Sequence, residues 1–153
     1  MVRGDSFSVL SRAIKQYEPV AVIALGQANR SAISIERVAI NVDDFSIEDN
    51  IGTVVTDTPV IVGAPSAYWS TLPIKELKSC LEEEDIPVNI SNSAGTFVCN
   101  HLFYNLQHAL KDSEIRSGFI HVPLLPEQVT SETQKSMTLD TVSYTHLTLP
   151  TKA

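Results

Sequence analysis

Cysteine, basic side chains and long apolar runs are all scarce in this chain of 153 residues. Its two cysteines, Cys80 and Cys99, are too few for a disulfide framework. No apolar run approaches the roughly 20 residues of a membrane-spanning helix, and no basic start followed by an apolar core marks a secretory signal. The 11 Lys and Arg residues against 18 Asp and Glu give a net charge of −7, which argues against a nucleic-acid partner. We therefore expect a cytoplasmic protein with reduced thiols and with neither a membrane nor a nucleic-acid partner.

The composition is otherwise that of a folded domain, with 43% hydrophobic and 19% charged residues. Short apolar runs at 20–25, 86–90 and 118–122 predict buried strands, and amphipathic stretches between them predict helices. This alternation predicts the α/β class, with three α/β/α layers around a mostly parallel, twisted sheet. The predicted helices are 7–17, 74–85, 99–110 and one that begins within 136–142, and further strand-like stretches are 31–42 and 53–62.

Both ends differ from those of an ordinary α/β domain. The chain opens in a helix-like segment with no strand before it, so we expect a first strand to be missing from a truncated domain at 1–142. The last residues, 143–153 (SYTHLTLPTKA), contain Thr and Pro where the final helix would continue. We expect this tail to break that helix and to be foreign sequence.

Three residues far apart in the chain suggest a catalytic site. Cys99 lies where a turn feeds a helix in 93–104 (SAGTFVCNHLFY), and His121 ends the following strand. Glu36 lies in an apolar stretch, where an unpaired acid is costly. In a parallel sheet such positions gather at the carboxyl edge, and a helix amino terminus favours a thiolate. A histidine base beside the thiol, oriented by a carboxylate, would make Cys99 a nucleophile.

Structural interpretations of the same three residues stay open at this point. Cys99 is equally a candidate for a small buried packing residue, as is Cys80 in its helix, and His121 for a core histidine. Glu36 could instead pair with Arg30 or Arg37 on the surface.

A metal site is a third interpretation, with Cys99, His101 and His108 as ligands. A helix places Cys99 and His101 about 200° apart, and the sequence has no CxxC or HExxH motif. Its glycines form no nucleotide-binding fingerprint either. We therefore expect neither a metal nor another cofactor.

Four segments carry a family resemblance: GQANRSAISIERVAIN, GAPSAYWSTLPIKEL, SNSAGTFVCNHLFY and GFIHVPLLPEQ. Together they resemble the pyroglutamyl peptidases, also called pyrrolidone carboxyl peptidases, from about residue 19 to residue 140. The resemblance implies a cytosolic cysteine peptidase that removes amino-terminal pyroglutamyl residues from peptides through a thioester and forms homo-oligomers. It implies the catalytic residues Glu36, Cys99 and His121, and the substrate-binding residues Gln27, Ile47, Phe97 and Val98.

The sequence also departs from the family pattern. The family's first strand and aromatic loop have no counterpart, Asn29 stands where the family usually has Gly-Gly, and Ser46 replaces an arginine. Two alternative functions follow. One is a non-catalytic fragment or binding module of the same fold, and the other is a thiol hydrolase with a different acyl substrate.

Overall fold

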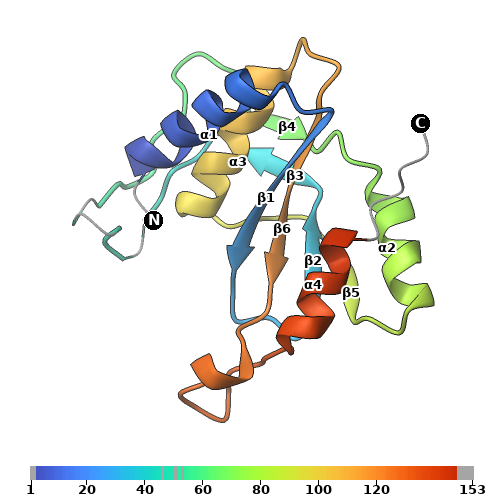
Figure 1. The fold of residues 1–153 in the computed structure, drawn as a ribbon. Helices are drawn as coiled ribbons and strands as arrows, with labels where there is room; N and C mark the ends of the chain where they lie inside the picture. Colours follow the sequence, from blue (N-terminus) through green and yellow to red (C-terminus); the bar gives the residue numbers. More distant parts are fainter. Residues whose placement is uncertain (1–2, 46, 50–51, 53, 148–153) are drawn as a thin grey trace.

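A computed structural model of the chain describes residues 3–45, 47–49, 52 and 54–147 (Figure 1). Two sheets are present in this part of the chain, one of four strands and one of two. The helices are α1 (Arg3–Tyr17), α2 (Ile74–Glu83), α3 (Val98–Leu110) and α4 (Leu139–Leu147), with a short 3-10 helix η1 (Pro126–Gln128). The strands are β1 (Ala21–Gln27), β2 (Ile33–Glu36), β3 (Val38–Ile40), β4 (Ala67–Trp69), β5 (Val88–Ser91) and β6 (Arg116–Val122).

The larger sheet has the strand order β1-β6-β2-β5. Strand β1 pairs with β6 in parallel over its whole length, and β2 pairs with β5 in parallel. Between these pairs, β2 runs antiparallel to β6. The predicted α/β fold with a mostly parallel sheet is therefore confirmed, but the central pairing reverses direction.

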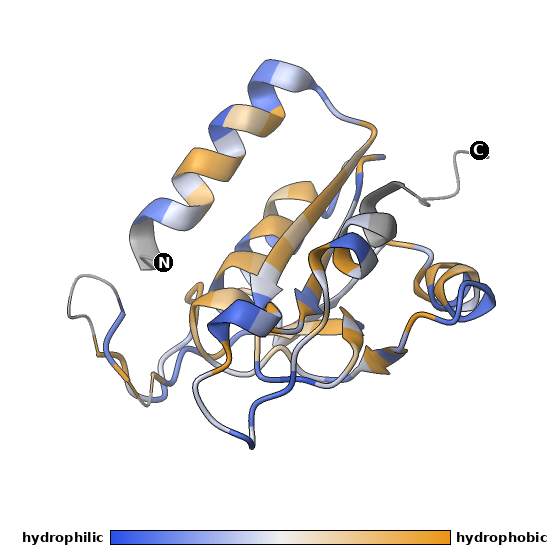
Figure 2. Cartoon of the chain, turned by 60° about the horizontal axis from the view of Figure 1, so that its bottom comes forward, coloured by the Kyte–Doolittle hydropathy of each residue, from blue (hydrophilic) through white to orange (hydrophobic). Residues whose placement is uncertain are grey.

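Alternate residues of the sheet feed two apolar cores, one on each face, because successive side chains of a strand point to opposite faces. Val22, Ala24 and Phe119 belong to the core beneath α1 and α3. Ile33, Ile35 and Ile120 belong to the core beneath α2 and α4. Figure 1 shows α1 and α3 side by side, apart from α2 and α4, and Figure 2 shows that β1 is largely apolar. The predicted three layers are thus present.

The antiparallel pairing corrects one sequence-based expectation. We expected the candidate catalytic residues to meet at a shared carboxyl edge of parallel strands. Strands β2 and β5 run against β6, so the end of β5 that leads toward α3 does not lie at the edge where β6 ends. The residues meet instead on the face of the sheet that α3 covers, because α3 packs against β6.

Two local predictions also need correction. The expected strands at 53–62 are absent from its described residues, 54–62, which pair with the chain through a bridge between Asp43 and Thr58 and a hydrogen bond from Phe45 N to Val55 O. The Asn41 side chain binds this segment instead, through the backbone of Ile61 and Ala64. The final helix does not break at residue 143, since α4 continues to Leu147. Among the described residues, no helix is both long and apolar enough to span a membrane.

Candidate active site

Glu36 and His121 form a buried pair between the antiparallel strands β2 and β6. Ser34 lies opposite His121 in the ladder, and Glu36, two residues further on, shares its face of the sheet. His121 Nδ1 lies 2.7 Å from Glu36 Oε1, and the exposed fractions of the two residues are 4% and 0%. Because Nδ1–H donates to the carboxylate, Nε2 is the ring nitrogen left to exchange a proton. This buried contact fits the catalytic prediction, and it equally fits the alternative of a satisfied core histidine.

Arg30 contacts the same carboxylate oxygen from the loop after β1. Its Nη2 lies 3.1 Å from Glu36 Oε1. Arg37, although adjacent to Glu36 in sequence, donates from Nε to Asn92 Oδ1 at 2.8 Å. The interpretation of Glu36 as a surface acid is wrong, since its side chain is fully buried, but its predicted partner Arg30 is correct.

Cys99 is the second residue of α3, which begins at Val98, and the residue before the helix, Phe97, has an extended backbone. Gly26 of β1 is the ladder partner of His121, so both residues face the same side of the sheet. A Cβ atom added at Gly26 would lie 3.0 Å from Cys99 Sγ. The fold thus brings the thiol to the strand position beside His121, although no hydrogen bond joins these two described side chains.

The thiol does not have the depressed pKa that its place at a helix start predicted. Burial, followed by the negative charge of Glu36, raises the pKa of Cys99 above its usual value of 9.0, and Arg30 opposes this rise. This direction is opposite to the one that the helix start alone predicted. A thiol with a raised pKa needs a base, and His121, whose ladder partner Gly26 lies beside the Cys99 sulfur, is the candidate.

The other candidate metal ligands have separate partners. His101 Nδ1 lies 2.8 Å from Asp43 Oδ2 in a second buried pair. His108 Nδ1 lies 2.8 Å from the Tyr68 hydroxyl. Within the described residues, no three His, Cys, Asp or Glu side chains are grouped so that they could hold a metal ion.

Of the four predicted substrate-binding residues, two immediately precede Cys99 in the sequence. Phe97 is half-buried against Phe45, with ring centroids 4.7 Å apart, and Val98 is 1% exposed. Gln27 ends β1 and donates from Nε2 to Gln128 Oε1 at 2.5 Å. Ile47 is 64% exposed. Phe97 and Val98 thus lie at the start of α3, whereas Gln27 and Ile47 are exposed.

Sequence reasoning missed the contacts that hold Cys99 in place. Asn100 is fully buried, and its side chain makes three hydrogen bonds, two to the Ile40 backbone and one to Val42 O. Thr96 exchanges two hydrogen bonds with the Asp44 backbone. An asparagine inside the apolar run FVCNHLF was the available signal, because a buried amide needs partners.

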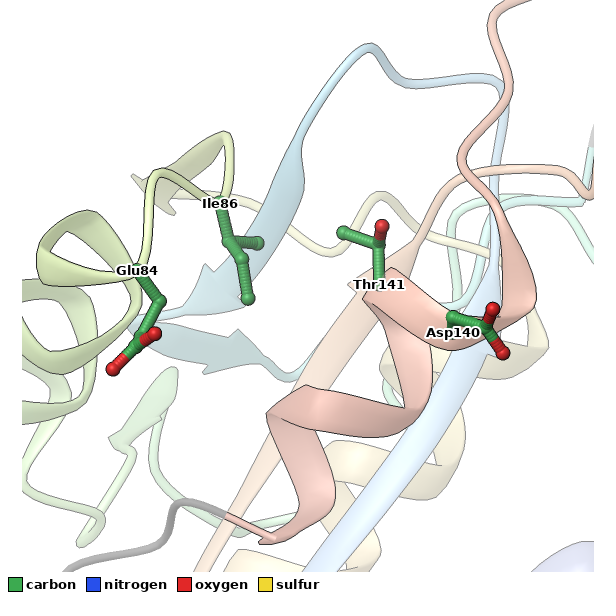
Figure 3. A pocket seen from close by; sticks show the side chains of 4 residues that line it. All are labelled: Glu84, Ile86, Asp140 and Thr141. Atoms are coloured by element: carbon green, nitrogen blue, oxygen red, sulfur yellow. The ribbon is translucent and has the colours of Figure 1, made fainter.

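A separate pocket lies between α2 and α4, on the other face of the sheet (Figure 3). Its volume is about 260 Å³, and Glu84, Ile86, Asp140 and Thr141 line it. None of these residues belongs to the Glu36, Cys99 and His121 cluster, so this pocket is not part of the candidate active site.

An α/β protein that places a cysteine beside a buried carboxylate–histidine pair has the arrangement of a thiol hydrolase. Comparison with known proteins narrows this class. A sequence model of the family described as pyroglutamyl peptidase matches residues 2–149. The chain belongs to the pyroglutamyl peptidase family, which is a family of cysteine peptidases.

Individual relatives agree with this assignment. The pyrrolidone-carboxylate peptidase of Aliivibrio fischeri (strain MJ11) is 52% identical over 144 residues, which cover 94% of this chain and 68% of the relative. That of Vibrio campbellii is 54% identical over 93% of this chain and 68% of its own length. The crystal structure of pyroglutamyl peptidase I from Bacillus amyloliquefaciens superposes with a TM-score of 0.89 at 42% identity, over 92% of this chain and 69% of that one. The structure of a mutant pyrrolidone carboxyl peptidase from Pyrococcus furiosus superposes with a TM-score of 0.87 at 40% identity, over 94% of this chain and 73% of that one.

Proposed function

We propose that this chain is a cysteine peptidase that removes amino-terminal pyroglutamyl residues from peptides, with Cys99, His121 and Glu36 as its catalytic residues. Membership of the pyroglutamyl peptidase family supports the substrate class. The observation that supports the residues is the buried 2.7 Å contact between His121 Nδ1 and Glu36 Oε1, on the face of the sheet where Cys99 begins α3.

In the proposed reaction, His121 Nε2 takes the proton of Cys99 Sγ, and the sulfur attacks the carbonyl carbon of the pyroglutamyl residue. The tetrahedral intermediate collapses to a thioester as the imidazolium returns its proton to the departing peptide amine. Water then attacks the thioester while His121 takes a proton from it. As this second tetrahedral intermediate collapses, the C–S bond breaks, pyroglutamate leaves, and the imidazolium returns the proton to the Cys99 sulfur. Glu36 fixes the tautomer of His121 and stabilises its positive charge at each step.

The start of α3 suits the charge that develops on the carbonyl oxygen. Backbone N–H groups in the first turn of an α-helix have no acceptor inside the helix, and the helix dipole is positive there. Cys99 lies in that turn. We propose that these N–H groups stabilise the oxyanion as the sulfur adds.

The pyroglutamyl ring is small and uncharged, with one amide donor and one carbonyl acceptor. We propose that Phe97, Val98 and Ile47 bury its methylene groups, and that Gln27 binds its amide. Gln27 already reaches the side chain of Gln128. Because that contact uses Nε2, we propose that Oε1 accepts from the N–H of the ring.

The test is hydrolysis of pyroglutamyl-aminomethylcoumarin under reducing conditions. We expect turnover by the parent chain, a loss of about 1,000-fold or more in Cys99→Ala, and nearly parental rates in the matched control Cys80→Ala. Prolyl-aminomethylcoumarin should not react, because its ring lacks the lactam carbonyl. A folded parent chain with no turnover would favour the non-catalytic alternative, and turnover of a different acyl-coumarin would favour another thiol hydrolase.

We also propose a cytoplasmic location and a homo-oligomeric state. Two free cysteines support the first, since thiols stay reduced in the cytosol. Exposed apolar side chains such as Trp69 (68%) and Val62 (86%) support the second. Light scattering during size-exclusion chromatography tests the oligomer, and a mass equal to one chain would contradict it.

A further inference from the structure

We propose that Arg30 is a positioning residue of this site, whose guanidinium holds the Glu36 carboxylate in place beside His121 and balances its charge beside Cys99. This inference rests on the proposed function for its effect on catalysis. Its geometry is independent of that function.

The contact geometry makes Glu36 depend on Arg30. His121 and Arg30 contact the same oxygen of the Glu36 carboxylate. Oε1 lies 2.7 Å from His121 Nδ1 and 3.1 Å from Arg30 Nη2. The other oxygen, Oε2, is buried and has no hydrogen-bond partner among the described residues. A fully buried carboxylate favours its neutral form unless a cation or donors stabilise the charge. Arg30 supplies a charge that does not titrate, because a guanidinium stays protonated in proteins.

The loop that carries Arg30 is anchored close to the site. Ala28 N donates to Val122 O at 3.0 Å, at the end of β6, and Arg30 N donates to Ala28 O at 2.8 Å. Arg30 Nη2 also lies 3.4 Å from Ser93 O, in the segment that leads to α3. The guanidinium thus contacts both the carboxylate and the segment before the nucleophile, which a side chain free in solvent would not do.

The ionisable groups around Cys99 come from three elements: Glu36 from β2, His121 from β6 and Arg30 from the loop after β1. Burial and then Glu36 raise the pKa of the Cys99 thiol, and Arg30 lowers it. His101, two residues after Cys99 on α3, forms a separate ion pair with Asp43. Arg30 is therefore the side chain whose positive charge opposes that of Glu36 at the thiol.

Arg37 offers a matched control. It is a second arginine, one residue from Glu36 in sequence, but its guanidinium binds Asn92 on the surface. Replacing Arg37 removes the same charge from the chain without removing a contact of Glu36. Any effect of net charge or of expression should appear equally in both variants.

The first experiment needs no substrate. The rate at which iodoacetamide alkylates Cys99 is measured against pH, with Cys80 replaced by alanine in every variant. Removing the positive charge of Arg30 makes the Cys99 thiol harder to ionise. The profile of alkylation rate against pH should therefore shift to higher pH in Arg30→Gln. At neutral pH, alkylation of this variant should be slower by at least about threefold. Arg30→Lys, which keeps the charge, and Arg37→Gln should stay within about twofold of the parent. A profile for folded Arg30→Gln that superimposes on the parent profile would overturn the inference.

The second experiment asks whether Arg30 acts through Glu36. In the parent background, Arg30→Gln should lower kcat for pyroglutamyl-aminomethylcoumarin about tenfold, with KM changed little, because the positioning contact does not touch substrate. In a Glu36→Gln background, the same change should cost less than about twofold. An equal loss in both backgrounds would contradict the positioning role. If the parent chain hydrolyses no pyroglutamyl substrate, the proposed function fails while the alkylation experiment still decides the role of Arg30.

Discussion

Gly26 leaves room for both the thiol and the aromatic ring beneath it. An added Cβ would lie 2.7 Å from Phe119 Cζ and 3.0 Å from Cys99 Sγ, closer than such atoms normally approach. We expect Gly26→Ala to lower kcat/KM at least about tenfold and the free energy of unfolding by about 1–3 kcal/mol, because the thiol or the ring must move. Coumarin release and urea unfolding measure the two effects. Leu25→Ala, on the opposite face of β1, is the control, and an equal loss of activity there would contradict this steric explanation.

The raised pKa of Cys99 predicts how its reactivity and its contribution to stability change with pH. The folded thiol keeps its proton to a higher pH than the unfolded one, so its stabilising contribution is complete below the unfolded pKa and is lost as pH rises through the folded pKa. We expect alkylation at neutral pH to be slower than for a free thiol, and Cys99→Ala to lose less stability than the parent as pH rises above 9.0, the usual pKa of a thiol. Rapid alkylation of Cys99 in mild acid would show that the thiolate is favoured after all.

Helix α3 is held at its first turn by side chains rather than by the sheet alone. Asn100 satisfies backbone groups of Ile40 and Val42 through three hydrogen bonds from a fully buried amide. We expect Asn100→Ala to lower the free energy of unfolding by about 3 kcal/mol, because it leaves buried polar groups without partners. Activity should fall with it, since Cys99 is the preceding residue.

Asn105 provides the comparison for this prediction. It lies on the same helix, but within the described part of the chain its Nδ2 donates only to His101 O, at 2.8 Å. Asn105→Ala should cost less than about 1 kcal/mol. Thermal unfolding of the two variants tests the difference, and similar losses would show that α3 does not depend on the Asn100 contacts.

The sequence pattern was sufficient for most of the elements but not for how they pair, and the candidate triad rested on the family resemblance rather than on the pattern. Apolar periodicity predicted β1, β5, β6, α2 and α3 to within a few residues, because it reports which faces are buried. The direction in which β2 pairs with β6 depends on contacts between residues more than 80 positions apart, such as Ser34 and His121, and no local pattern encodes it. Arg30 and Arg37 illustrate the same limit, since only the folded chain shows which of them turns toward Glu36.

At the scale of the whole molecule, the candidate active site and the aliphatic core lie on opposite faces of the sheet. The face beneath α1 and α3 carries the candidate active site, and the opposite face carries a core of aliphatic side chains from β2, α2 and α4. Val142 of α4 is 7% exposed within that second core. Damage to this core should therefore change stability without changing the chemistry.

We expect Val142→Ala to lower the free energy of unfolding by about 1–2 kcal/mol, through lost burial and a small cavity. For a chain of this size that corresponds to a Tm lower by about 3–6 °C. Leu139→Ala is the control, because Leu139 lies on the same helix but is 60% exposed. KM for the coumarin substrate and the alkylation rate of Cys99 should match the parent in both variants well below Tm. A parental Tm for Val142→Ala would mean that α4 contributes little to the core, and altered alkylation of Cys99 would mean that the two faces are coupled.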